Sequence, residues 1–142
     1  MTQAEQIQQV NFYYCGKASM QASEKKILVV DDNADAADMT AQILQMYGLQ
    51  VQVAYGGPEG LALARANRPD LIFLDIGMPL MDGYQVAQAV RADATLSKVM
   101  LVALTAWGDE ASRNKARAAG FDMHLTKPAN IVELLDIAGG KC

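Results

Sequence analysis

Short, wholly apolar runs that alternate with helix-like stretches are the feature that most limits how this chain can fold. Residues 27–30 (Ile-Leu-Val-Val) form the first such run, and its β-branched composition is typical of a strand buried on both faces. The next residues, 34–47, place apolar side chains three or four positions apart, which predicts a helix that ends at Gly48. The same alternation continues along the chain.

Five strand–helix pairs are expected in all. The strands are predicted at residues 27–30, 51–54, 70–75, 98–105 and 121–125, and the helices at 34–47, 58–66, 84–92, 109–119 and 130–137. Short connections repeated in this way indicate a parallel sheet that is covered by helices on both faces. We therefore predict a flavodoxin-like, doubly wound α/β fold with five parallel strands in the order 2-1-3-4-5 and five helices.

Composition narrows the possible functions. The 142 residues suit one domain, and 51% hydrophobic with 20% charged residues is typical of a globular protein. A net charge of −4 with no basic cluster in the sequence argues against nucleic-acid binding. No apolar segment is long enough to cross a membrane. Cys15 and Cys142 lack the spacing of metal ligands, so we expect reduced thiols and a cytoplasmic protein.

The pattern changes abruptly near Glu24. We expect residues 1–24 to be a flexible or partly helical N-terminal leader, because Ile7, Val10 and Tyr14 fall at helical spacing but the rest is polar. Residues 25–138 are expected to form the folded domain, and 139–142 a short tail. No DNA-binding or enzymatic output domain is expected after it.

Polar residues follow the apolar runs at the points where the predicted strands end. Asp31 and Asp32 follow the first strand, Asp75 ends the third, Thr105 ends the fourth and Lys127 follows the fifth. Because the carboxyl ends of parallel strands lie along one edge, these side chains should meet. Clustered carboxylates repel one another unless a cation lies among them, and oxygen ligands suit Mg²⁺. With an ammonium and a hydroxyl added, such a site can accept and hold a phosphoryl group.

Five motifs in this chain resemble one family, the receiver domains of two-component response regulators and hybrid histidine kinases. They are VVDDN at 29–33, DLIFLDIGMP at 70–79, MDGY at 81–84, ALTA at 103–106 and GFDMHLTKP at 120–128. Their order and spacing also match, and the resemblance covers about Lys25 to Ile137. Each motif alone would be weak, but the five together are highly specific.

The resemblance implies a phosphorelay function. Asp75 would be the phosphoacceptor, which takes a phosphoryl group from a phosphohistidine of a histidine kinase or histidine phosphotransfer protein. Asp32 and Asp75 would bind Mg²⁺ directly, Asp31 would orient a coordinated water, and the Gly77 backbone carbonyl would supply another oxygen. Such a module is not an enzyme with an external substrate, because it catalyses only its own phosphorylation and dephosphorylation.

The resemblance also implies residues that bind the phosphoryl group and report it. Lys127 would pair with a phosphoryl oxygen, Thr105 would donate its hydroxyl, and the small Ala106 would leave room for the group. The Lys127–Pro128 bond would be cis. Thr105 and His124 would form the switch, in which the side chain at 124 turns inward when the threonine moves.

Signalling would then leave through a downstream protein that docks on residues 109–119, 121–125 and 130–137. The alternative is a pseudo-receiver, a protein-binding module that phosphorylation does not regulate, and the intact acidic set counts against it. A flavin- or nucleotide-binding enzyme would need a glycine-rich loop after the first strand. An aspartyl phosphohydrolase would usually need a second acid two residues past Asp75, where this chain has Gly77.

Overall fold

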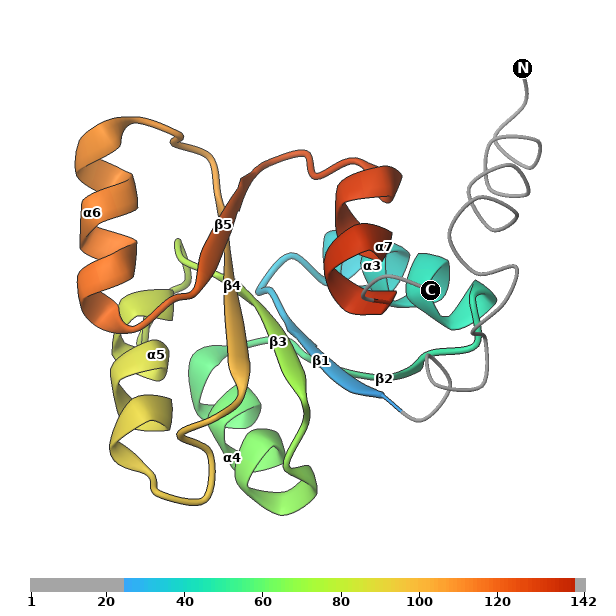
Figure 1. The fold of residues 1–142 in the computed structure, drawn as a ribbon, viewed down its shortest axis with the longest axis horizontal. Helices are drawn as coiled ribbons and strands as arrows, with labels where there is room; N and C mark the ends of the chain where they lie inside the picture. The colour runs from blue at the N-terminus through green and yellow to red at the C-terminus, as the bar shows by residue number, and fades with distance from the viewer. Residues whose placement is uncertain (1–24, 140–142) are drawn as a thin grey trace.

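The computed structural model describes residues 25–139, in which strands and helices alternate (Figure 1). The elements in chain order are β1 (Lys26–Val30), α3 (Ala34–Met46), β2 (Gln50–Ala54), α4 (Gly57–Asn67), β3 (Leu71–Asp75), α5 (Gly83–Ala92), β4 (Met100–Thr105), α6 (Glu110–Ala119), β5 (Met123–Thr126) and α7 (Ile131–Gly139). The strands of this part of the chain are parallel and lie in the order β2-β1-β3-β4-β5. The predicted doubly wound α/β fold is therefore confirmed.

Some predictions concern residues outside the described range. These are the leader at 1–24, the thiols of Cys15 and Cys142, and the last residues of the tail. Within 25–139, no helix combines the length and the apolar character that crossing a membrane requires.

The three central strands β1, β3 and β4 are buried on both faces of the sheet, which explains their apolar runs. Ile27 and Val29 of β1 pack in a cluster with α3 and α7, while Leu28 and Val30 pack in a second cluster with α4, α5 and α6. Figure 1 shows these two groups of helices on opposite sides of the sheet. Because successive side chains of a strand point to opposite faces, both sets must be apolar. The sheet is thus a rigid base for the loops at its carboxyl edge.

Polar caps start the helices that follow two of these loops. The Asn33 side chain accepts a hydrogen bond from the Ala36 N–H at 3.1 Å and begins α3. Asp82 and Gln85 form a reciprocal capping box at 2.9 and 3.0 Å, which begins α5. Such caps satisfy N–H groups that the first turn leaves open. They therefore hold the ends of the loops that follow β1 and β3.

The observed boundaries differ from the predicted ones by one or two residues, for local reasons. β4 begins at Met100 rather than at residue 98, because a turn spans residues 94–98. β5 begins at Met123 rather than at 121, because the Phe121 N–H bonds back to a carbonyl of α6 at 3.1 Å. α7 continues to Gly139 rather than ending at 137, and helix ends are the least specified part of such patterns.

One arginine joins three segments at the amino edge of the sheet. Arg91, near the end of α5, donates to the carbonyl oxygens of Gly120, Ser97 and Val99 at 2.9, 2.9 and 2.6 Å. It also forms an ion pair with Asp122 at 2.8 Å. These contacts fasten the carboxyl end of α6 to the segments that lead into β4 and β5. Arginine suits this role because its planar guanidinium carries several donors in fixed directions.

Candidate functional site

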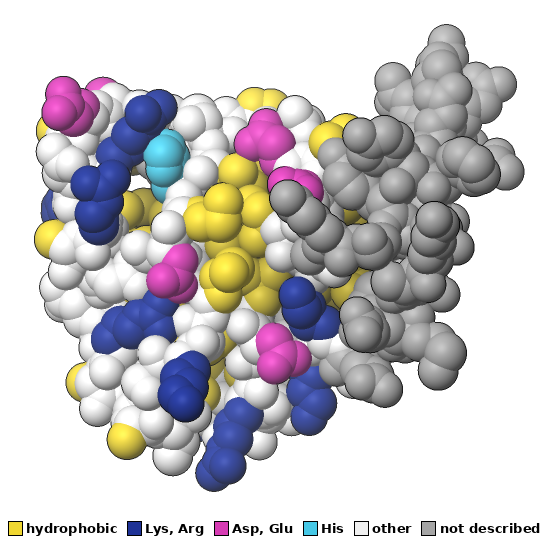
Figure 2. Space-filling model, in the orientation of Figure 1, with side chains coloured by type: hydrophobic (Ala, Val, Ile, Leu, Met, Phe, Trp, Pro, Cys, Tyr) yellow, Lys and Arg dark blue, Asp and Glu magenta, His cyan; other side chains and the backbone are white. Residues whose placement is uncertain are grey.

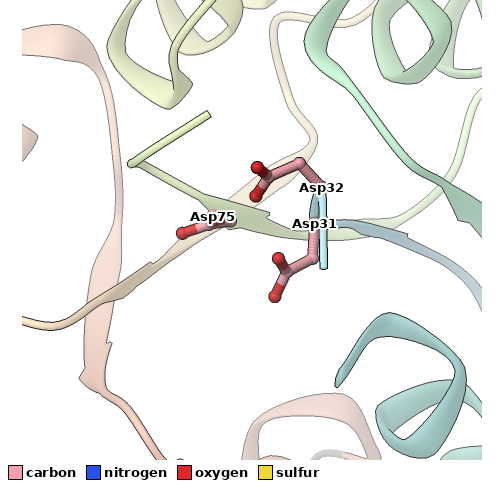
Figure 3. A group of neighbouring side chains, drawn as sticks. All are labelled: Asp31, Asp32 and Asp75. Carbon is pink, nitrogen blue, oxygen red and sulfur yellow. The ribbon is translucent and has the colours of Figure 1, made fainter. Parts of the chain in front are cut away.

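The structure brings together the carboxylates that end β1 and β3. Asp31 and Asp32 directly follow β1, and Asp75 is the last residue of the neighbouring β3. Their ligand oxygens all lie within 4.8 Å of one another, and Figure 3 shows the three side chains on the same side of the strand ends. Asp31 and Asp75 are buried, whereas Asp32 is exposed. The cluster lies where the strand order reverses, which is the usual ligand site of such a sheet.

Lys127 joins two of these carboxylates. Its ammonium lies 3.1 Å from Asp31 Oδ2 and 3.0 Å from Asp75 Oδ1. The Lys127 N–H also donates to the Thr105 carbonyl oxygen at 2.7 Å, and the bond from Lys127 to Pro128 is cis. The loop after β5 is thus tied to the end of β4 and turns its amine toward the acidic cluster.

The two oxygens of Asp75 have different surroundings. Oδ1 accepts hydrogen bonds from Lys127 and, at 3.3 Å, from the Gly77 N–H. Oδ2 accepts no hydrogen bond from residues 25–139. This oxygen is in contact with solvent. The Asp75 carboxylate is therefore held in place through one oxygen, while the other is open to a ligand or to an electrophile.

The charges in the cluster do not balance. Burial raises the pKa of Asp31 above its usual value, and the nearby Asp75 carboxylate adds to this, although the Asn33 N–H and Lys127 oppose it. Burial lowers the pKa of Lys127, but its bonds to Asp75 and Asp31 outweigh that effect, so the pKa is raised and the amine stays charged. One ammonium thus faces three carboxylates. A hard divalent cation fits this all-oxygen set, because it would remove the excess negative charge.

The hydroxyl of Thr105 is engaged locally. It donates to the Trp107 carbonyl oxygen at 3.1 Å and accepts from the Trp107 N–H at 3.0 Å. Thr105 is buried at the end of β4, and Ala106 after it is exposed. The hydroxyl must leave the Trp107 carbonyl before it can donate to a group bound at Asp75.

His124 lies away from the acidic cluster. It is a half-buried residue of β5 that pairs with Ala103 of β4. In this register its side chain lies on the same face of the sheet as Ala103 and Thr105, which is the face covered by α6. It lines a small hollow there with Arg113 and Arg117.

The backbone beside Asp75 leaves no room for a side chain at Gly83. A Cβ there would lie 2.6 Å from the Asp75 carbonyl oxygen and 2.7 Å from Ile76 Cα, whereas a Cβ at Gly77 would meet nothing within 4 Å. We expect Gly83→Ala to lower the free energy of unfolding by about 1–3 kcal/mol through overpacking against the backbone. Urea denaturation will measure this, with Gly77→Ala as the matched control. Equal stability of the two variants would contradict the expected clash.

Two large apolar side chains near the site are exposed. Trp107, two residues past Thr105, is 63% exposed, and Leu80, in the loop after β3, is 97% exposed. Leu80 also has a φ of 69°, in the left-handed region that leucine disfavours. Leu80 had no predicted role, and the ion pairs of Lys127 with Asp31 and Asp75 were not predicted. The sequence did contain a signal for these ion pairs, because it placed the strand-end acids and the strand-end lysine at the same edge of the predicted sheet.

Comparisons with known proteins agree on one family. Residues 27–138 match the family model described as the response regulator receiver domain. The DNA-binding dual master transcriptional regulator RpaA of Synechocystis is 37% identical over 110 residues, which cover 78% of this chain and 46% of RpaA. Protein PilH of Pseudomonas aeruginosa is 33% identical over 110 residues, 78% of this chain and 91% of PilH.

A solved structure supports the same family. Chemotaxis protein CheY4 of Vibrio cholerae superposes with a TM-score of 0.76 and 33% identity over 80% of this chain and 94% of that one. The chain spans about half the length of RpaA and of the probable transcriptional regulators ycf27 that it also matches, and nearly the whole of PilH and CheY4. With a family model matched over most of its residues, this chain belongs to the response regulator receiver domain family.

Proposed function

We propose that this chain is the phosphoacceptor of a two-component phosphorelay, with Asp75 as the residue that is phosphorylated. The observation that carries the proposal is the geometry of Asp75: one oxygen is held by Lys127 and Gly77, and the other is open beside Asp31 and Asp32. A pseudo-receiver would not need this arrangement. Receiver domains take their phosphoryl group from histidine kinases, so the donor is a histidine kinase or a histidine phosphotransfer protein.

In the proposed reaction an Asp75 oxygen attacks the phosphorus atom of a phosphohistidine. A phosphorus–oxygen bond forms, the phosphorus–nitrogen bond breaks, and the imidazole leaves on the donor. The Lys127 ammonium would then pair with one phosphoryl oxygen. The Thr105 hydroxyl would donate to another, in the space beside Ala106.

The acidic cluster fits a magnesium ion in this reaction. When bound by Asp32, Asp75 and the Gly77 carbonyl, Mg²⁺ supplies positive charge that offsets the phosphoryl oxygens. Asp31, whose Oδ1 is held by the Asn33 N–H at 3.0 Å, would orient a coordinated water. The only reactions that this chain promotes would be its own phosphorylation and dephosphorylation.

Incubation with acetyl phosphate and Mg²⁺, followed by intact-mass measurement, tests the proposal. The expected result is a gain of one phosphoryl mass that hydroxylamine removes, since acyl phosphates react with it. An unchanged mass after prolonged incubation would favour the pseudo-receiver, which binds partners without being phosphorylated.

Output is proposed to pass to a downstream protein that docks on the face formed by α6, β5 and α7. RpaA is named as a DNA-binding regulator, but this chain matches less than half of it. For the residues present here, the expectations of no contact with nucleic acid or membrane and of a cytoplasmic location remain predictions.

Thr105 and His124 are proposed as the switch between the site and that face. The two lie on the same side of the sheet, on neighbouring strands β4 and β5. On phosphorylation the Thr105 hydroxyl should leave Trp107, because a hydrogen bond to a charged oxygen is worth roughly 1.5–3 kcal/mol. The space it vacates can admit the ring of His124. NMR shifts of Thr105 and His124 with a beryllofluoride mimic should change together, and an unchanged His124 beside a responding site would exclude the switch.

A further inference from the structure

A hollow between α6 and β5 is lined by two arginine side chains and one histidine. Arg113 and Arg117 of α6 and His124 of β5 surround a space of about 50 Å³ that opens to solvent. Figure 2 shows dark blue side chains gathered beside the cyan histidine over this part of the molecule. The hollow lies on the α6–β5 side, away from the carboxylates of the acidic cluster.

The two arginines have no partner within the domain. Neither Arg113 nor Arg117 forms a hydrogen bond or ion pair with any residue of 25–139. They stand four residues apart on one helix, where like charges destabilise the helix. The carboxylate in the hollow, Asp122, is already bonded to Arg91 and to the Leu101 N–H, both at 2.8 Å. Two guanidinium groups therefore point at the hollow with their donors unused by the fold.

The positive charge is local, which limits what could bind. The chain carries a net charge of −4, and α7, which covers the other face of the sheet, has Glu133 and Asp136 but no basic residue in its last turn. Lys115 lies over the Tyr84 ring, 4.5 Å from its centre, rather than at the hollow. A long polyanion or a charged lipid surface would meet the acidic remainder of the domain. A short acidic segment could instead contact the two arginines of the hollow without contacting the acidic surface around them.

We propose that the hollow formed by Arg113, Arg117 and His124 binds acidic side chains of a protein partner. Guanidinium groups pair with carboxylates through two parallel hydrogen bonds. The negative α7 would repel such a segment, and so confine it to the α6 side of the domain. The use of this contact in signalling rests on the proposed function, but the binding itself does not require phosphorylation.

An NMR titration tests the binding, with a blocked oligoglutamate peptide as probe and oligoglutamine of the same length as its control. The expected result is that oligoglutamate shifts the side-chain resonances of Arg113, Arg117 and His124, and that oligoglutamine does not. The double variant Arg113→Glu/Arg117→Glu should weaken the binding by at least about tenfold. Arg113→Gln/Arg117→Gln should weaken it in the same direction without adding repulsion.

A matched control is a pair of basic residues that do not line this hollow. Arg68 and Lys98 line a second hollow, of about 170 Å³, at the amino edge of the sheet, and Arg68→Glu/Lys98→Glu changes the net charge equally. Unchanged binding in the Arg113 and Arg117 variants, or an equal loss in the control, would overturn the proposal. All variants should still gain the acetyl phosphate label at Asp75, so a failure here is separate from a failure of the proposed phosphorylation.

Discussion

The variant Asp75→Asn is expected to lose all labelling by acetyl phosphate and by any phosphohistidine donor. An amide oxygen is a far weaker nucleophile than a carboxylate oxygen. Its attack on phosphorus would also not give an acyl phosphate, because the amide nitrogen stays bonded to the carbonyl carbon. The fold should survive, because the Asp31–Lys127 ion pair remains and one repelling charge is removed. Intact-mass measurement after incubation with the donor will report the loss.

The control for this variant is Asp35→Asn, which removes an exposed carboxylate from the first turn of α3. It should label as fast as the unaltered chain, because Asp35 does not belong to the cluster. If Asp75→Asn still gained a phosphoryl group, peptide mapping would identify another acceptor, and the proposed role of Asp75 would be wrong.

Removal of Mg²⁺ is expected to have the second largest effect. With excess chelator, labelling should fall to background, because the Asp31, Asp32 and Asp75 carboxylates would repel the incoming phosphoryl oxygens. Added Mg²⁺ should also stabilise the fold, by about 2.7 kcal/mol at a concentration of roughly 100 times its dissociation constant. Thermal unfolding with and without the ion will measure this.

Acid should weaken the stabilisation of the fold by Mg²⁺. The pKa of Asp31 is raised, so this group takes up a proton at a higher pH than an ordinary aspartate does. The stabilisation by Mg²⁺ should therefore decline as the pH falls toward and through that raised pKa. Asp32→Asn should lose both the stabilisation and the labelling. Full labelling in chelator, or stabilisation that persists in Asp32→Asn, would contradict the assigned metal site.

The fold was predictable because each of its parts left a local pattern in the sequence. The apolar, β-branched run at 27–30 predicted a strand buried on both faces, and β1 is such a strand. Glycine after a helix-like stretch marked its end, as Gly120 does after α6 with a φ of 111°. The short connections predicted a parallel sheet, and the order 2-1-3-4-5 was predicted as the flavodoxin-like arrangement of such a sheet. The meeting of Asp31, Asp32 and Asp75 then followed from the geometry of a parallel sheet.

Other features depend on contacts that no local pattern records. Arg91 looks like any helix-surface arginine, and its partners lie at residues 97–99 and 120–122, in loops. The hydrogen bonds of Thr105 to Trp107 reflect the path of one loop. Within residues 25–139, the side chains of Arg113 and Arg117 of α6 bond to no other residue, and this is evident only once the partners of the other charges have been assigned.

The contacts of Arg91 have a mechanical consequence for α6. They pin the carboxyl end of the helix, at Gly120, to the segments before β4 and β5, while its amino end is joined to Thr105 by three residues of loop, 106–108, and the cap Asp109. Because α6 is held at Gly120, a small displacement at Thr105 would move Glu110 the most and Ala119 the least. The helix would act as a lever, and its first turn would sweep the widest arc.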